Sequence, residues 1–166
     1  MKNLTLLCII FILSTSTLSI QESLPKLSLT EKKIERLAKH IHTKYKIKYK
    51  DVKDIVIASF KHSNKDSFPT PIDTLAIIAI ESSFNKNAYS TTNDNGLMQI
   101  SYKKSSTDIN SNIKDGVFLL RENKKFLNTD AAIQAYNLGL TGYRKGKRNL
   151  AYLHKFKLVK LELENI

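Results

Sequence analysis

Residues 70–85 read T-P-I-D-T-L-A-I-I-A-I-E-S-S-F-N, and this stretch decides the fold. Thr70 is a suitable N-cap, and Pro71 suits the first position of a helix because an N–H would have no helical partner there. From Ile72 to about Ser82 the residues are apolar nearly all round the predicted helix. A helix without a polar face is buried, so the sequence predicts a central helix surrounded by other elements.

Amphipathic helices are predicted on both sides of this central helix, because apolar residues recur there at intervals of three and four. The first helix begins just after Thr30, and the short fifth helix is capped by Thr129 or Asp130 and ended by Gly139. With approximate bounds, the predicted helices cover residues 31–45, 52–60, 72–82, 112–126, 131–138 and 150–163. The sequence therefore predicts the all-α class, a single helical domain with at most a small hairpin in residues 89–101.

Composition and charge limit the classes of function. The chain has 166 residues, of which 42% are hydrophobic, and this is enough for one domain with a core. Its formal net charge is +12, which suits a nucleic acid, an acidic membrane surface or an anionic cell envelope. Lysines far outnumber the four arginines, and lysine lacks the bidentate fork that reads guanine, so sequence-specific DNA binding is disfavoured. A lysine-rich composition spread over solvated surfaces is the simplest explanation of most of this charge.

The N-terminus has the pattern of a secretory signal. Lys2 supplies a short basic start, residues 4–13 form an apolar run that is short for a membrane span, and small hydroxyl residues follow up to Ser19. The single cysteine, Cys8, lies inside the apolar run, so the mature chain would contain no disulfide. We predict a signal peptide at 1–19 and export to the periplasm or the cell exterior, with the membrane contacted only through this segment.

Glu81 lies at the end of the predicted apolar helix. A carboxyl in such surroundings is poorly solvated, so its protonated form is favoured and its pKa is expected to rise. A protonated glutamic acid near neutral pH is the proton donor that cleavage of a glycosidic bond needs. A glutamate at a helix end is usually a solvated surface group, so the assignment depends on the motifs that follow it.

Glu81 belongs to the first of four sequence blocks that occur in a fixed order. The blocks are E-S-S-F-N at 81–85, A-Y-S ending at Ser90, G-L-M-Q at 96–99 and A-Y-N-L-G at 135–139. Together they resemble the catalytic domain of the soluble lytic transglycosylases, which are lysozyme-like enzymes that cut peptidoglycan. A weaker element of that family, D-x-x-x-N-I-x-x-G-x-x-L, is similar to residues 108–119. Four blocks in the right order are far more specific than any one of them, and they cover roughly residues 72–153.

The resemblance implies a lysozyme-like fold and a lyase activity on peptidoglycan, without a cofactor. Glu81 would protonate the glycosidic oxygen between N-acetylmuramic acid and N-acetylglucosamine. It would then act as a base on the C6 hydroxyl of the muramic acid, which attacks the anomeric carbon and gives a 1,6-anhydro product. The implied organisation is a signal peptide (1–19), a linker (20–30), an N-terminal helical extension (31–70) and a catalytic domain (71–166).

The same resemblance implies five substrate-binding residues. Ser90 would bind the N-acetyl group of the substrate, and Met98 and Gln99 would line the cleft near the catalytic carboxyl. Tyr136 and Asn137 would close the far side, with the Tyr136 hydroxyl near that carboxyl. Each has a simpler structural interpretation: Met98 as a core residue, Tyr136 as a half-buried aromatic and Asn137 as a helix C-terminal signal.

Asp94 is a candidate second carboxylate. It lies two residues before Gly96, as in some specialised transglycosylases of secretion systems and conjugation machines that this sequence resembles. If it faced Glu81 it would stabilise an oxocarbenium ion or steer a water, and a separation of about 5–5.5 Å would fit a retaining mechanism with two carboxylates. The simpler interpretation is a turn residue in an Asn-Asp-Asn loop.

Alternative functions remain open at this point. One is a muramidase that uses water on the same fold, and another is a non-catalytic protein that binds the cell wall. Nucleic-acid binding rests on charge alone and is disfavoured by the predicted export. The four histidines show no metal-ligand spacing, so no metal is predicted. The expected partners are peptidoglycan strands and, for a specialised member, a secretion or conjugation apparatus.

Overall fold

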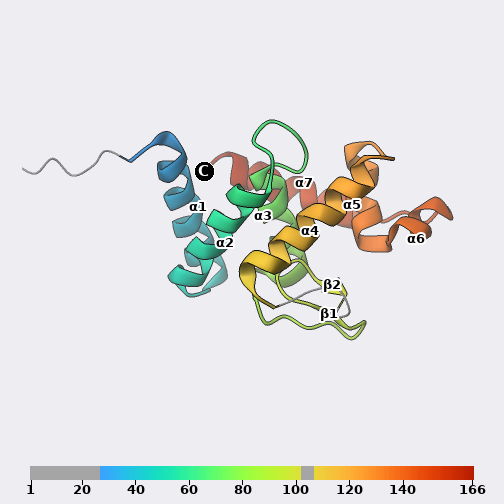
Figure 1. Ribbon diagram of the computed structural model, residues 1–166, viewed down its shortest axis with the longest axis horizontal. Coiled ribbons are helices and arrows are strands. Elements are labelled where there is room, and N and C mark those ends of the chain that lie inside the picture. Colours follow the sequence, from blue (N-terminus) through green and yellow to red (C-terminus); the bar gives the residue numbers. More distant parts are fainter. Residues whose placement is uncertain (1–26, 102–106) are drawn as a thin grey trace, which may run out of the picture.

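The computed structural model describes residues 27–101 and 107–166 (Figure 1). This part of the chain forms seven helices and one two-stranded hairpin. Their bounds are α1 Leu29–Tyr45, α2 Tyr49–His62, α3 Pro71–Ser82, β1 Asp94–Asn95, β2 Ile100–Ser101, α4 Ile109–Lys124, α5 Thr129–Leu138, α6 Leu140–Arg144 and α7 Leu150–Glu164. The predicted class, mostly α-helical with at most a small hairpin, is confirmed. The predicted signal peptide, 1–19, lies outside the described residues.

The predicted central helix is α3. The Thr70 hydroxyl accepts a hydrogen bond from the Asp73 N–H, and the Asp73 carboxylate accepts one from the Thr70 N–H at 2.9 Å, so a capping box starts the helix. Every residue from Pro71 to Ala79 is buried. Because α2 and α7 both pack against α3, its apolar surface is covered on more than one side, as the sequence predicts.

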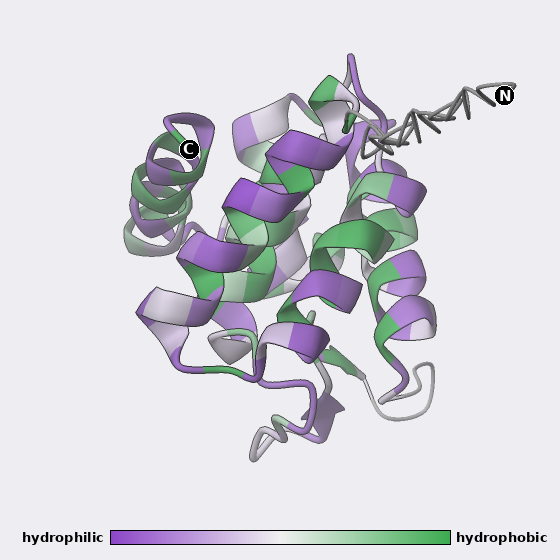
Figure 2. Ribbon diagram, turned by 90° about the vertical axis from the view of Figure 1, so that its left-hand side faces the viewer, coloured by the Kyte–Doolittle hydropathy of each residue, from purple (hydrophilic) through white to green (hydrophobic). Residues whose placement is uncertain are grey.

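The two N-terminal helices belong to the same core. α1 packs against α2, and α2 packs against both α3 and α4. α1 begins two residues earlier than predicted, because Ser28 instead of Thr30 is the N-cap and forms a capping box with Glu31. Hydrophobic and hydrophilic residues alternate along these helices, as expected of amphipathic segments (Figure 2).

The hairpin is fastened to α4 by one buried side chain. The paired residues are Asp94 with Ser101 and Asn95 with Ile100. Asn112 of α4, which is fully buried, accepts a hydrogen bond from the Met98 N–H at 2.8 Å and donates one to the Asn95 carbonyl at 3.2 Å. Gly96 has a φ of 75°, and a Cβ there would lie 2.4 Å from the Asn112 amide nitrogen, so the close approach requires glycine.

The C-terminal helices differ from the prediction in two details. α5 is capped by Asn128, whose side chain accepts a hydrogen bond from the Ala131 N–H, and not by Thr129 or Asp130. Gly139 ends it as predicted. α6 was not predicted, because five residues are too few to show a helical repeat. No helix in residues 27–101 and 107–166 is long and apolar enough to cross a bilayer.

Candidate active site

Glu81 lies in the last turn of α3, where the chain leaves the core. The next turn is sharp, because Ser83 and Phe84 both adopt positive φ angles, 51° and 63°. The Phe84 side chain is fully buried and its ring centroid lies 4.8 Å from that of Tyr45. An aromatic anchor therefore fixes the end of the central helix and, with it, the position of Glu81.

Tyr152 of α7 is the hydrogen-bond partner of Glu81. Its hydroxyl donates a short hydrogen bond to Glu81 Oε1. The contact follows from the packing of α7 against α3, which also brings Lys160 within 2.8 Å of Asp73 at the start of α3. Tyr152 is not among the site residues predicted from the sequence, although the resemblance extends to residue 153. The pairing joins residues 71 positions apart, so no local pattern points to it.

The surroundings raise the pKa of Glu81. Burial is the largest cause and raises it, and the negative charge of Asp94 raises it further. The Tyr152 hydrogen bond and the positive charge of Lys155 lower it, without cancelling the effect of burial. Glu81 is therefore protonated at higher pH than an exposed glutamate, which is the property predicted from the apolar helix.

Tyr136 is connected to the candidate active site through the backbone of the hairpin turn. Its hydroxyl donates a hydrogen bond to the Met98 carbonyl at 2.7 Å, while Tyr152 supplies the direct contact with Glu81. Burial raises the pKa of Tyr136 and of Tyr152 well above the usual range, and the charge of Glu81 raises both further. Both phenols therefore remain protonated donors near neutral pH.

Met98 and Gln99 lie in the hairpin turn. The Met98 side chain is fully buried, in contact with α4 at Gly116, where a Cβ would lie 2.3 Å from the sulfur. Its side chain therefore supports the site from the core. Gln99 is partly exposed, and its side-chain amide donates to the carbonyls of Ala88 and Gly96. These bonds close the loop that carries Ser90 and Asp94.

Ser90 and Asp94 are joined in one turn. The Ser90 hydroxyl accepts a hydrogen bond from the Asp94 N–H at 3.0 Å. The Asp94 carboxylate accepts hydrogen bonds from the hydroxyls of Thr92, at 2.7 Å, and Ser90, at 3.3 Å. Asp94 is thus held at the start of β1 by the turn that precedes it, and its charge acts on Glu81 and Tyr136.

Asn137 lies at the exposed end of α5. Its side-chain oxygen accepts a hydrogen bond from the Asn149 amide at 2.8 Å. Asn149 also caps α7, because its side chain accepts from the Tyr152 N–H and its own N–H donates to Gln134. Asn137 is therefore connected, through Asn149, to the helix that carries the partner of Glu81.

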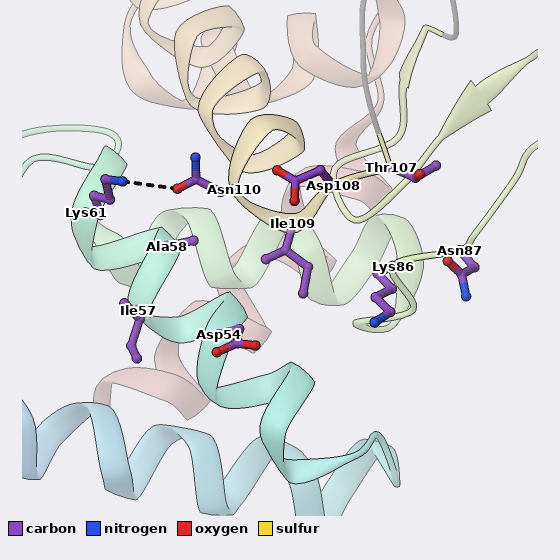
Figure 3. A pocket seen from close by; sticks show the side chains of 10 residues that line it. All are labelled: Asp54, Ile57, Ala58, Lys61, Lys86, Asn87, Thr107, Asp108, Ile109 and Asn110. Carbon is purple, nitrogen blue, oxygen red and sulfur yellow. Dashed lines mark hydrogen bonds between the residues drawn. The ribbon is translucent and has the colours of Figure 1, made fainter.

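A pocket of about 710 Å³ lies elsewhere, between α2, the loop after α3 and the start of α4 (Figure 3). None of the site residues predicted from the sequence lines it. In Figure 3 Lys61 points toward Asn110 at one end, 3.4 Å away, and Lys86 and Asn87 lie at the other. In the described part of the chain, no cluster of histidine, cysteine or acidic side chains is arranged to hold a metal ion.

The fold and the site together define a class: a helical, lysozyme-like domain with a partly buried carboxyl at the end of its central helix. The family model described as the transglycosylase SLT domain matches residues 59–158, which are 100 of the 166 residues, so the chain belongs to this family. No curated protein and no solved structure matches the chain significantly. Family membership assigns a peptidoglycan-degrading function of the transglycosylase type, with peptidoglycan as the bound substrate.

Proposed function

We propose that this protein is an exported lytic transglycosylase that cleaves the β-1,4 bond between N-acetylmuramic acid and N-acetylglucosamine. The observation that carries the proposal is the state of Glu81, which is partly buried, has a raised pKa and accepts a hydrogen bond from Tyr152. A carboxyl in this state keeps its proton to higher pH than an exposed glutamate does, which suits a proton donor to a leaving group.

In the proposed reaction Glu81 acts twice. As an acid it gives its proton to the glycosidic oxygen, and the bond from that oxygen to the anomeric carbon of the muramic acid breaks. As a carboxylate it then takes the proton of the C6 hydroxyl, whose oxygen forms the new bond to the anomeric carbon. Tyr152 stabilises the carboxylate between the two steps, because its hydrogen bond lowers the pKa of Glu81.

The product and one glutamate variant test the proposal. Digestion of purified peptidoglycan is expected to release muropeptides with 1,6-anhydro ends, identified by mass spectrometry. Glu81→Gln is expected to lose at least about a hundredfold in rate, the usual scale of general acid–base catalysis. Glu35→Gln is a matched control, because Glu35 also accepts a hydrogen bond from a tyrosine, Tyr49, but lies on α1. Equal lytic activity of the two variants would remove Glu81 from the mechanism and favour a non-catalytic wall-binding role.

A muramidase that uses water is the second candidate function. The observation in its favour is the charge of Asp94, which acts on Glu81 from the hairpin. A carboxylate there would steer a water or stabilise an oxocarbenium ion. Reducing muramic acid ends in place of anhydro ends would establish the hydrolase. Asp94→Asn would then abolish hydrolysis, whereas a transglycosylase in which Asp94 has only a structural role would retain most of its rate.

The location and biological partners are part of the same proposal. Residues 1–19 would direct export, and the lytic domain would reach peptidoglycan from the periplasm or the cell exterior. Deletion of residues 1–19 is expected to leave the protein in the cytoplasmic fraction of expressing cells. For a specialised member the partner would be a secretion or conjugation apparatus, and a loss of assembly in a strain carrying Glu81→Gln would support this role.

A further inference from the structure

Two segments that are distant in the sequence form a basic patch at one end of the molecule. The end of α4 and the loop after α6 both lie in the right-hand part of Figure 1. The guanidinium carbon of Arg144 lies 5.5 Å from the ring centroid of Phe126, so the two segments are in contact. We call this surface the basic end patch, and its members are Lys124, Phe126, Arg144, Lys145, Lys147 and Arg148.

The cations of the basic end patch lack carboxylate partners. Seven lysines in the described part of the chain form ion pairs, including the neighbours Lys125, with Glu122, and Lys157, with Asp130. Among the described residues, no carboxylate lies within ion-pair distance of any of the five cations of the patch. Five positive charges that form no ion pair therefore lie on these two neighbouring segments.

Local contacts hold the patch in a defined shape. The Arg148 guanidinium stacks on the ring of Tyr143, at 3.9 Å, and donates hydrogen bonds to the carbonyls of Tyr143 and Lys147. Arg144 lies over Phe126, whose side chain is nevertheless 65% exposed. Leu150, two residues after Arg148, is 68% exposed. Large apolar side chains therefore project into water beside the cations.

We propose that the basic end patch docks on the surface of an anionic lipid bilayer. Unpaired lysines and arginines are attracted to acidic headgroups, and exposed aromatic or leucine side chains enter the boundary between headgroups and acyl chains. An anionic polymer in solution would use the same charges, but it would gain nothing from burying Phe126. The exposed apolar side chains among the cations therefore favour the bilayer over a polymer.

Docking there would orient the candidate active site. Asn149 directly follows the patch loop, hydrogen-bonds to Asn137 and caps the helix that carries Tyr152. Arg148 precedes Tyr152 by four residues in the sequence. A bilayer bound at Arg148 would thus lie near the start of α7, the helix whose tyrosine contacts Glu81. The proposal concerns where the enzyme is held, and it stands or falls independently of the reaction that Glu81 performs.

Vesicle sedimentation tests the proposal. The chain from residue 20 onward is used, because the predicted signal segment would itself enter a bilayer. Binding is measured to vesicles of phosphatidylglycerol with phosphatidylcholine and to phosphatidylcholine alone. We expect strong, salt-sensitive binding to the first and weak binding to the second.

Matched variants separate the patch from net charge. The patch variant changes Lys124, Arg144, Lys145 and Lys147 to Gln, and the control changes Lys39, Lys48, Lys65 and Lys114 to Gln. All four control lysines are exposed, and none forms an ion pair within the described residues. At about fivefold per charge, the patch variant is expected to lose at least about a hundredfold in binding to anionic vesicles. Equal losses in the patch and control variants would overturn the proposal, since net charge alone would then explain binding.

Phe126→Ser distinguishes a bilayer from a polymer. We expect it to weaken binding to anionic vesicles by at least about fivefold, because the ring no longer enters the interface. Binding to inorganic polyphosphate, the polymer probe, should be unchanged in this variant. If Phe126→Ser binds vesicles as the parent does while the patch variant binds neither target, the surface serves an anionic polymer and the bilayer proposal is wrong.

Discussion

Replacement of Asn112 by alanine should destabilise the fold strongly, because one buried side chain holds the hairpin to α4. The variant would leave the Met98 N–H and the Asn95 carbonyl, both buried, without these partners. An unsatisfied buried group costs about 1–3 kcal/mol, so the two together cost about 2–6 kcal/mol. A domain of this size has a total stability of about 5–15 kcal/mol, so the loss would be a large fraction of it.

Urea denaturation of the parent and the variants measures this cost. With a slope of about 1–3 kcal/mol per molar, the midpoint of Asn112→Ala should fall by at least about 0.7 M. Asn110→Ala is the matched control, because Asn110 lies on the same helix but is exposed, and its loss should cost no more than about 0.5 kcal/mol. If both variants unfold at the same midpoint, the hairpin is held by something other than the buried amide, and the reasoning fails.

Three further changes test the site and its support. Gly116→Ala would place a Cβ 2.3 Å from the sulfur of the buried Met98, which destabilises the fold, whereas the better helix propensity of alanine offsets part of this cost. We expect the free energy of unfolding, measured by urea denaturation, to fall by about 1–2 kcal/mol. Because the pKa of Glu81 is raised in the folded state, ionisation of Glu81 lowers the stability of the fold as the pH rises. The melting temperature of Glu81→Gln should therefore exceed that of the parent by more at neutral pH than at about pH 3–4. An equal difference at both pH values would contradict the raised pKa. Tyr152→Phe removes a hydrogen bond that lowers the pKa of Glu81, so the alkaline limb of the activity–pH profile should move to higher pH, in addition to any loss of rate.

The sequence predicts the fold where the signal is local and repeated. The apolar stretch from Ile72 onward, with a threonine cap and a proline at the first position, sufficed to place the central helix and to foresee its burial. The N-cap positions are harder to predict than the helices themselves, because serine, threonine and asparagine all accept the same hydrogen bond and several of these residues lie near each helix start. Ser28 and Asn128 were therefore not distinguished from their neighbours Thr30 and Thr129.

The site was predicted in part, for a different physical reason. The raised pKa of Glu81 follows from burial, and the apolar pattern of the helix already predicts that burial. Tyr152 was not predicted, because its role depends on how two helices pack and not on its own neighbours in the chain. Met98 and Ser90 were assigned to the substrate by resemblance, whereas in the structure the first is core and the second ties the turn at Asp94. Their part in substrate binding stays a prediction.

The packing of α3 against α7 explains why a tyrosine so far along the chain reaches the carboxyl. Glu81 and Asp73 are eight residues apart on α3, and their partners Tyr152 and Lys160 are eight residues apart on α7, in the opposite order. Eight residues of helix span about 12 Å, so the two contacts are spaced alike on antiparallel helices. The buried Asp73 carboxylate therefore fixes the register of α7, since a shift of one turn would leave its charge unpaired. The same register aligns the Tyr152 hydroxyl with Glu81. The ion pair of Asp73 with Lys160, at the start of α3, therefore helps to place Tyr152 against Glu81 at the end of α3.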